Sequence, residues 1–347
     1  MPCCAECFGD RGLRKSLIPA SPSARIGNCF YCGCVGVQIV DPGDLAQYFE
    51  LVVGAYSLAP DGRTLVHLLR EDWGLFEKAG MDDARATALL ADVLEEPDRL
   101  HQTFLPPSVT ADRLSDWEKL RDELMYRNRF FPDANMDLVR LGNLLDALKI
   151  EPDEAPSSWY RARIQPDDTP FPIGKMGAPP SRIATHGRAN PAGIPYLYLG
   201  SQPHTAIAEI RPHTGELVSV ADFTTPPDLR LIDLRHPRKV VSPFVLADSA
   251  DVIQMRSDLP FLERLGDELM RPVLPQAAAI DYTPSQYLCE FIKKRGYDGL
   301  LYRSSVSSGI NLALFEPTRA AAGTVIQYRV TRVSVDAASM APPAGTP

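Results

Sequence analysis

The spacing of hydrophobic residues changes partway along the chain and divides it into segments of different secondary structure. Between residues 36 and 150, apolar side chains recur at steps of three and four, the period of helices that pack one face together. Two runs show this period most clearly: Leu114, Trp117, Leu120 and Leu124, and then Leu138, Leu141, Leu144, Leu145 and Leu148. We therefore predict an all-α helical bundle over residues 36–150.

From residue 159 the pattern changes to short runs of branched and aromatic residues separated by Gly, Pro and Asp, which is typical of β-strands. Helical stretches lie between these runs. The sequence therefore predicts an α+β domain over residues 155–335, preceded by a polar, proline-containing linker at 151–158. The strand-like runs are 196–199, 217–220, 230–234, 299–302, 311–315 and 325–330, and the helical stretches are 202–210, about 245–270 and 284–295.

The first 35 residues have a different signature, since six of the seven cysteines lie there. Cys4-x2-Cys7 and Cys29-x2-Cys32 are two pairs separated by 21 residues, the layout of a four-thiolate zinc site. Cys3 or Cys34 could replace a neighbouring ligand, and disulfides or unligated thiols are the alternatives. A closed site of this kind is structural, so we predict a small zinc-binding module over residues 1–35.

Composition and charge narrow the class of protein. The 347 residues are 45% hydrophobic and 23% charged, as in ordinary globular chains of more than one domain. The net charge of −8 is concentrated in residues 36–150, which hold 21 acidic and 12 basic residues. This acidic segment argues against nucleic-acid binding. We see no membrane span or signal peptide, and we predict a cytoplasmic protein with a disordered tail at 336–347.

Candidate chemistry comes from four phrases in which polar residues stand where strands or turns end. They are Trp159-Tyr-Arg-Ala-Arg163, Gly187-Arg-Ala-Asn-Pro-Ala-Gly193 with the following Tyr196-Leu-Tyr198, Thr205-Ala-Ile-Ala-Glu-Ile210, and Tyr302-Arg-Ser-Ser305 with Gly309-Ile-Asn311. In the third phrase, a helix starting with Ser201 as its N-cap would place Glu209 on its buried side. A carboxylate there needs a partner or a role in function. The phrases contain no Rossmann or P-loop motif.

In this order, the four phrases resemble the RES domain, and the resemblance covers nearly all of residues 159–320. It implies a mixed-sheet domain similar in fold to ADP-ribosyltransferases, and an activity that consumes NAD. It also implies a site made of Arg161, Arg188, Tyr198, Glu209, Ser304 and Asn311.

The chemistry of NAD suits these residue types. Positive charge grows on the ribose as nicotinamide leaves, and Glu209 can stabilise that charge and hold the ribose hydroxyls. Arginines grip phosphate oxygens with paired bonds, so Arg161 and Arg188 suit the pyrophosphate. Tyr198 offers a ring face for nicotinamide or ribose. Neutral hydrogen bonds to the substrate or an incoming phosphate are expected from Ser304 and Asn311.

Several of these assignments have competitors that the sequence leaves open. Arg163 has the same strand orientation as Arg161, and Ser305 neighbours Ser304. Arg188 could instead form an ordinary ion pair.

The helical segment, with the cysteine pairs and the phrase Asp72-Trp-Gly-Leu-Phe76, resembles the HEPN-like domain found ahead of RES domains. Many HEPN proteins are ribonucleases in which a spacer of four to six residues separates an Arg from a following His. Arg63 and Arg99, which precede His67 and His101, do not have that spacing. We therefore expect a regulatory or scaffolding role for this segment.

The leading hypothesis is an NAD phosphorylase or glycohydrolase that acts as a toxin of a toxin–antitoxin or defence system, with inorganic phosphate as a possible co-substrate. Its restraint would come from an antitoxin, another regulatory protein or the N-terminal half. Two alternatives stay open, namely a protein ADP-ribosyltransferase and a non-enzymatic nucleotide-binding regulator. The oligomeric state is also open.

Overall fold

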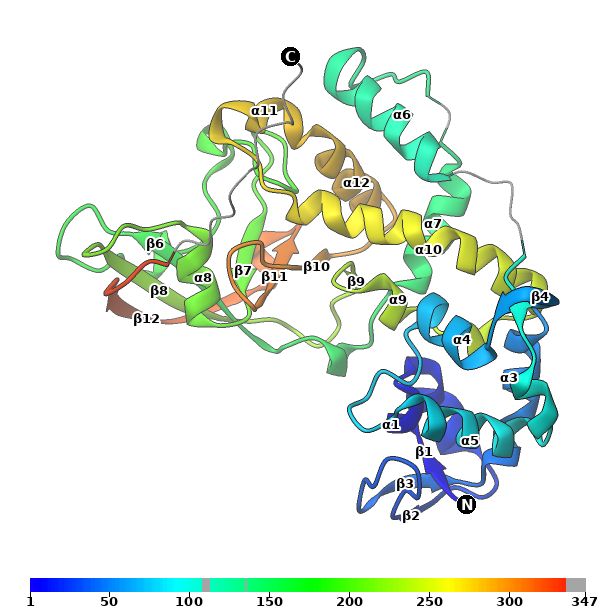
Figure 1. The fold of residues 1–347 in the computed structure, drawn as a ribbon. Coiled ribbons are helices and arrows are strands. Elements are labelled where there is room, and N and C mark those ends of the chain that lie inside the picture. Colours follow the sequence, from blue (N-terminus) through cyan, green and yellow to red (C-terminus); the bar gives the residue numbers. More distant parts are fainter. Residues whose placement is uncertain (108–112, 135, 335–347) are drawn as a thin grey trace, which may run out of the picture.

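The N-terminal part of the molecule is a small sheet with short helices beside it (Figure 1). The computed structural model describes residues 1–107, 113–134 and 136–334. Strands β1 (Cys3–Cys4), β3 (Val37–Val40) and β2 (Arg25–Gly27) pair antiparallel in the order β1-β3-β2. Because β3 pairs with both other strands, this sheet extends past the boundary expected at residue 35. The short helices are α1 (Ala5–Phe8), a π-helical turn (Leu13–Leu17) and α2 (Ile18–Ala20).

Helices dominate the next part, as their periodicity predicts. Its helices are α3 (Ala46–Val53), α4 (Leu65–Trp73), α5 (Asp83–Leu94), α6 (Arg113–Tyr126) and α7 (Leu138–Ala147). Most of the predicted apolar positions on α6 and α7 are buried, whereas Leu114 and Leu138, the first in each run, are exposed. The part is not purely helical, because β4 (Ser57–Arg63) and β5 (Phe104–Leu105) form a two-stranded sheet.

The C-terminal part is built on a seven-stranded sheet in the order β12-β8-β6-β7-β11-β10-β9. All its pairings are antiparallel except the parallel pair of β10 and β9. The prediction of a mixed sheet with helices is therefore confirmed. The strands are β6 (Ser158–Ile164), β7 (Leu197–Gly200), β8 (Leu217–Thr224), β9 (Leu231–Asp233), β10 (Gly299–Arg303), β11 (Ile310–Leu314) and β12 (Ala321–Arg329).

Five helices accompany this sheet: α8 (Pro203–Glu209), α9 (Pro237–Val240), α10 (Ser249–Met270), α11 (Ala278–Asp281) and α12 (Thr283–Lys294). Short 3₁₀ helices lie in the connections at Pro42–Leu45, Pro97–His101, Pro152–Glu154, Ile173–Lys175, Ser181–Ile183, Pro243–Val245, Pro275–Ala277 and Pro317–Arg319.

The sheet opens between β6 and β7. Strand β6 pairs with β8 along its whole length, from Ser158 to Ile164, but with β7 only through Tyr160 and Gly200. Beyond that single pair the two strands separate, so side chains and backbone of both become available to line a space between them. This opening positions the candidate site.

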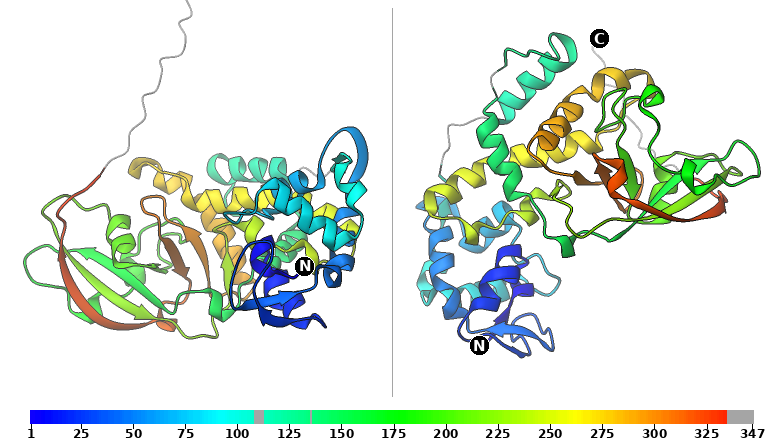
Figure 2. Two further views of the ribbon diagram at one scale, coloured as in Figure 1. Left: turned by 60° about the horizontal axis from the view of Figure 1, so that its bottom comes forward. Right: turned by 180° about the vertical axis from the view of Figure 1, so that it is seen from behind.

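The helical part and the seven-stranded sheet share one hydrophobic core, which runs from Cys3 to Phe315. Two features join them. Residues at the end of the helical segment bond to the edge strand of the sheet, since the Ile150 amide donates to the Leu231 carbonyl at 3.1 Å. The long helix α10 begins at the N-terminal helices, where Ser249 Oγ donates to the Leu51 carbonyl, and ends beside the sheet (Figures 1 and 2).

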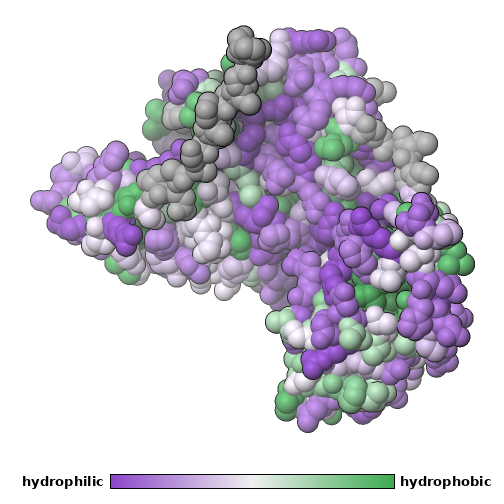
Figure 3. All heavy atoms as spheres, in the orientation of Figure 1, coloured by the Kyte–Doolittle hydropathy of each residue, from purple (hydrophilic) through white to green (hydrophobic). Residues whose placement is uncertain are grey.

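The face of the molecule in Figure 3 is mostly hydrophilic, with hydrophobic residues gathered at the N-terminal part, at lower right. Of the helices in the described residues, none has both the length and the apolar character of a membrane span. The predicted tail at 336–347 lies outside the described residues.

Candidate active site

The pocket between β6 and β7 has a volume of about 280 Å³ and takes its lining from six separate segments of the C-terminal part. Of the six predicted site residues, five line it and the sixth, Ser304, contacts one of them. Tertiary folding therefore gathers the four phrases of the sequence around one cavity. The predicted residues in the lining are Arg161, Arg188, Tyr198, Glu209 and Asn311.

Glu209 is the last residue of α8 and is half-buried at the pocket wall. Its Oε1 accepts two hydrogen bonds, from Ser304 Oγ at 2.7 Å and from Asn311 Nδ2 at 2.6 Å. These two donors fix the orientation of the carboxylate, and no hydrogen bond from the described residues reaches Oε2. The second oxygen is therefore free to meet a ligand. The sequence did not predict these bonds to Glu209, and the expected contact of both donors with the substrate stays a prediction.

The helix that presents Glu209 begins differently from the prediction. Ser201 was expected to be its N-cap, but the N-cap position belongs to Gln202, which makes no side-chain capping bond. Instead, Ser201 Oγ accepts a hydrogen bond from the Ile310 amide at 3.1 Å. This contact ties the start of the helix to β11, so the serine joins the two elements that place Glu209 and Asn311.

Arg161 lies on β6 and is half-buried, with its Nε shielded from solvent. Its Nη1 donates to the Tyr198 carbonyl at 3.2 Å, and its Nε has no hydrogen-bond partner among the described residues. Burial, with a smaller repulsion from Arg163, lowers the pKa of Arg161 to about 10, so the group stays charged at neutral pH. A buried cation without an anion is costly. Its surroundings therefore suit an anionic ligand.

The competing arginine, Arg163, points elsewhere. It donates a hydrogen bond to the Lys175 carbonyl, and its guanidinium lies 4.4 Å from the centre of the Phe171 ring. Because Arg163 is absent from the pocket lining, the structure places only Arg161 of the pair at the site.

Arg188 projects from the loop that follows Gly187. Its Nη1 donates to the backbone carbonyl of Arg271 at 2.6 Å, and its Nη2 donates to Ser305 Oγ at 3.4 Å. Its guanidinium also lies 5.5 Å from the centre of the Tyr282 ring. Among the described residues no carboxylate ion-pairs with it, so the ordinary ion pair that the sequence left open is not formed.

Tyr198 holds the loop that carries Arg188. Its hydroxyl accepts hydrogen bonds from the Ala189 and Asn190 amides at 3.0 and 3.2 Å, and donates to Asn190 Oδ1 at 2.7 Å. Burial raises the pKa of Tyr198, which keeps the phenol protonated and able to donate. A Cβ at Gly187 would lie 2.5 Å from this hydroxyl, so glycine is required there. Only the ring of Tyr198 is left for a ligand.

Two tyrosines that sequence reasoning did not assign also line the pocket, Tyr160 and Tyr302. Tyr302 is 4% exposed and is the register partner of Asn311. Burial raises its pKa well above the usual value, which keeps the hydroxyl neutral. Because side chains on a strand alternate, Tyr302 shares a face with Ser304, and that alternation was the available signal.

The cysteine pairs also come together. The Sγ atoms of Cys4, Cys7, Cys29 and Cys32 all lie within 4.8 Å of one another. A tetrahedral zinc ion with Zn–S bonds of about 2.3 Å separates its sulfur atoms by about 3.8 Å, so these four thiols fit such an ion. Cys34 lies outside this set and accepts a hydrogen bond from Lys78 Nζ at 2.6 Å.

Residues 158–336, just over half of the chain, match the family model of the RES domain. The chain belongs to the RES domain family. One solved structure, the M. tuberculosis MbcT–MbcA toxin–antitoxin complex, is 15% identical, and the match covers 55% of this chain and 92% of that one with a TM-score of 0.31. No curated protein matches the chain. The family match starts at residue 158, so the HEPN-like resemblance of residues 36–150 stays a prediction.

Proposed function

We propose that this RES domain protein consumes NAD, breaks its nicotinamide–ribose bond, and acts as a growth-inhibiting toxin. One observation carries the proposal. A carboxylate with one oxygen fixed and one free, on Glu209, shares a pocket with two arginines, Arg161 and Arg188, that have no carboxylate partner in the described residues. The family match adds support for chemistry on NAD.

The reaction needs little proton transfer at the leaving group. When the bond between ribose C1′ and the nicotinamide nitrogen breaks, its electron pair returns to the positively charged ring, which leaves as neutral nicotinamide. Positive charge develops on the ribose, and Glu209 Oε2 would stabilise it and accept a bond from a ribose hydroxyl. An oxygen of phosphate then bonds to C1′, or water does so and releases a proton.

The two arginines would bind the pyrophosphate. Arg161 is half-buried without an anion, so a phosphate group would supply the counter-charge that the protein does not. Arg188 is held in place by the Arg271 carbonyl, which occupies one of its amino groups and leaves other N–H donors for a ligand. Tyr302 would add a neutral donor at the pocket wall.

The test is NAD loss with the purified protein, with and without inorganic phosphate, beside Glu209→Gln. We expect the variant to lose activity by at least about 100-fold, as when one electrostatic catalytic group is removed. Glu290→Gln, an exposed glutamate on α12, is the matched control and should keep full activity. Unchanged NAD in the wild-type reaction, or equal rates for both variants, would contradict the proposal.

The products identify the acceptor. Phosphate-dependent loss with ADP-ribose phosphate as product indicates a phosphorylase, and free ADP-ribose indicates a glycohydrolase. ADP-ribose attached to protein in a treated lysate would favour the transferase alternative. Growth arrest on expression of the wild type but not of Glu209→Gln tests the toxin role, and an antitoxin is the partner we expect.

We also propose that Cys4, Cys7, Cys29 and Cys32 hold one structural zinc ion. Four thiolates would fill its coordination and leave no open position for a substrate. Elemental analysis should find about one zinc per chain, and Cys29→Ser should lose it along with the thermal stability of the N-terminal part. Metal-free wild type with unchanged stability would overturn this assignment.

A further inference from the structure

Helix α10 carries two fully buried carboxylates, and both face arginines from helices outside the RES match. Asp258 is 0% exposed and pairs with Arg113 of α6 and Arg140 of α7. Ten residues further along the same helix, the side chain of Glu268 is also 0% exposed. The helical segment is thus attached to α10 at two points.

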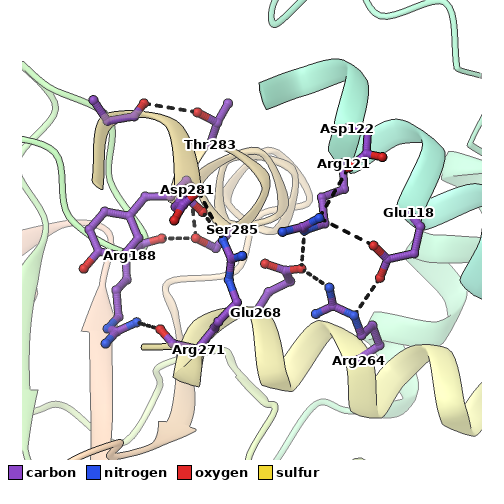
Figure 4. Close-up of polar contacts among 12 residues, drawn as sticks. Glu118, Arg121, Asp122, Arg188, Arg264, Glu268, Arg271, Asp281, Thr283 and Ser285 are labelled. Atoms are coloured by element: carbon purple, nitrogen blue, oxygen red, sulfur yellow. Dashed lines mark hydrogen bonds and ion pairs between the residues drawn. The ribbon is translucent and has the colours of Figure 1, made fainter. Parts of the chain in front are cut away.

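Glu268 lies at the centre of the second attachment (Figure 4). Its Oε1 is 3.1 Å from Arg121 Nε of α6 and 2.7 Å from Arg264 Nη2 of α10 itself. Arg264 also donates through Nε to Glu118 Oε1 of α6 at 2.7 Å. Two arginines and two glutamates therefore lock the last turns of α10 against α6.

One turn beyond Glu268 lies Arg271, the C-cap of α10, and this end of the helix supports the active-site arginine. The Arg271 carbonyl accepts from Arg188 Nη1 at 2.6 Å, and its guanidinium donates to the Asp281 carbonyl at 3.0 Å (Figure 4). A helix C-terminus carries partial negative charge, which favours a bound cation. The position of the helix end therefore sets the position of the Arg188 guanidinium.

No residue of 1–150 that the structure describes lines the pocket, so the helical segment can influence it only from a distance. We propose that Glu268, held by Arg121 of α6, is a positioning residue that places the end of α10 and, through it, Arg188. Helix α6 then affects NAD binding through α10, although it contributes no described residue to the pocket lining. This inference rests on the proposed function for its substrate.

The physical reason is the cost of a buried charge without its partner. If the carboxylate of Glu268 is neutralised, Arg121 and Arg264 keep Glu118 but lose the buried counter-charge that α10 itself supplies, and the last turn of α10 is free to shift. A displacement of about 1 Å at a substrate-positioning group can cost up to about 100-fold in rate. Asp258 offers a control, since its side chain is equally buried and also forms ion pairs with two arginines, but it lies about 15 Å along the helix from Glu268.

The experiment compares Glu268→Gln with Asp258→Asn in the full chain. We expect a similar loss of thermal stability in both, but a rise in KM for NAD of roughly tenfold, with kcat less affected, only in Glu268→Gln. Arg121→Lys keeps the charge but not the paired geometry, and should give a smaller rise in KM. Equal KM values for Glu268→Gln and Asp258→Asn would overturn the proposal.

A second measurement separates this inference from the proposed function. Binding of inorganic pyrophosphate, followed by calorimetry, reports on Arg188 without turnover. We expect weaker binding in Arg188→Gln and Glu268→Gln but not in Asp258→Asn, even if the wild type fails to consume NAD. Should Glu268→Gln fail to fold, the same comparison is made with Arg121→Lys and Arg140→Lys, and equal binding by these two would overturn the proposal.

Discussion

Arginines serve opposite purposes in two regions of this molecule. Along α10, Arg113, Arg140 and Arg121 each meet a carboxylate buried at 0% exposure. In the pocket, Arg161 and Arg188 face backbone carbonyls and hydroxyls instead, and no described carboxylate pairs with them. Arginines therefore neutralise buried carboxylates along α10, whereas in the pocket they have no anionic partner among the described residues. An anionic ligand in the cavity can supply the missing counter-charge.

The largest effect is expected where an arginine pair is removed from the interface. In Arg113→Met/Arg140→Met, Asp258 keeps its burial but loses both counter-charges, which should cost about 3–5 kcal/mol of unfolding free energy. Urea unfolding measures this cost. Adding Asp258→Met should recover most of it, because apolar side chains can replace a buried ion pair. A double variant as stable as the wild type would contradict the claim that these arginines stabilise the fold by neutralising Asp258.

A buried carboxylate without an arginine pair should respond to pH. Asp10 accepts bonds from the Leu13 amide and Ser242 Oγ, both at 2.8 Å, and burial raises its pKa to about 6 from 3.8. Protonated Asp10 therefore stabilises the folded state by roughly 3 kcal/mol relative to its ionised form. This stabilisation is fully present below pH 3.8 and is lost as the pH rises through 6. Relative to Asp10→Asn, the wild type should therefore lose stability between pH 4 and pH 7. Parallel stability profiles would contradict this.

In the pocket, removing an arginine should cost activity and not stability. Arg161→Met deletes a half-buried cation that has no carboxylate partner, so the thermal midpoint should stay level or rise. The loss of charged bonds to the pyrophosphate should lower kcat/KM by about 100-fold. Arg163→Met is the control, since that arginine lies outside the lining, and its kcat/KM should change little. A large loss of stability in Arg161→Met would show that this arginine is structural.

The smallest effect separates two neighbouring serines. Ser304→Ala removes one of two donors to Glu209 and should lower kcat by about tenfold, in line with a hydrogen bond to a charged group worth about 1.5 kcal/mol. Ser305→Ala removes only a 3.4 Å contact to Arg188 and should change kcat/KM by about twofold or less. Steady-state kinetics of both variants would show the order, and the reverse order would assign the role to Ser305.

The sequence by itself determined the local features of this protein. The period of its apolar residues located helices α6 and α7 and most strands of the large sheet, because each element must bury one face. Two cysteine pairs predicted which four thiols would meet, and four phrases in order predicted which segments would form the site. Each of these signals lies within a short stretch of sequence, so it can be recognised without knowledge of the fold.

Tertiary structure decided what each side chain contacts. Ser304 and Asn311 reach Glu209 across 95 and 102 residues of chain, so the sequence could name them but not their partner. Strand alternation places Arg161 and Arg163 on the same face of β6, and only the folded structure shows that Arg161 alone of the two lines the pocket. Such contacts depend on where paired strands separate in the folded sheet. The spacing of hydrophobic residues along one strand does not encode that position.

The contacts that attach α10 to α6 could likewise not be predicted from local sequence. Glu268 and Arg121 are acidic and basic residues on helices that a sequence assigns to separate domains, and both are expected on a solvated surface. Glu268 is buried and Arg121 half-buried because the helical segment and the sheet share one core, which forces charges at the contact to pair. Packing of distant segments, and not their own composition, turned these charges into a link to the active site.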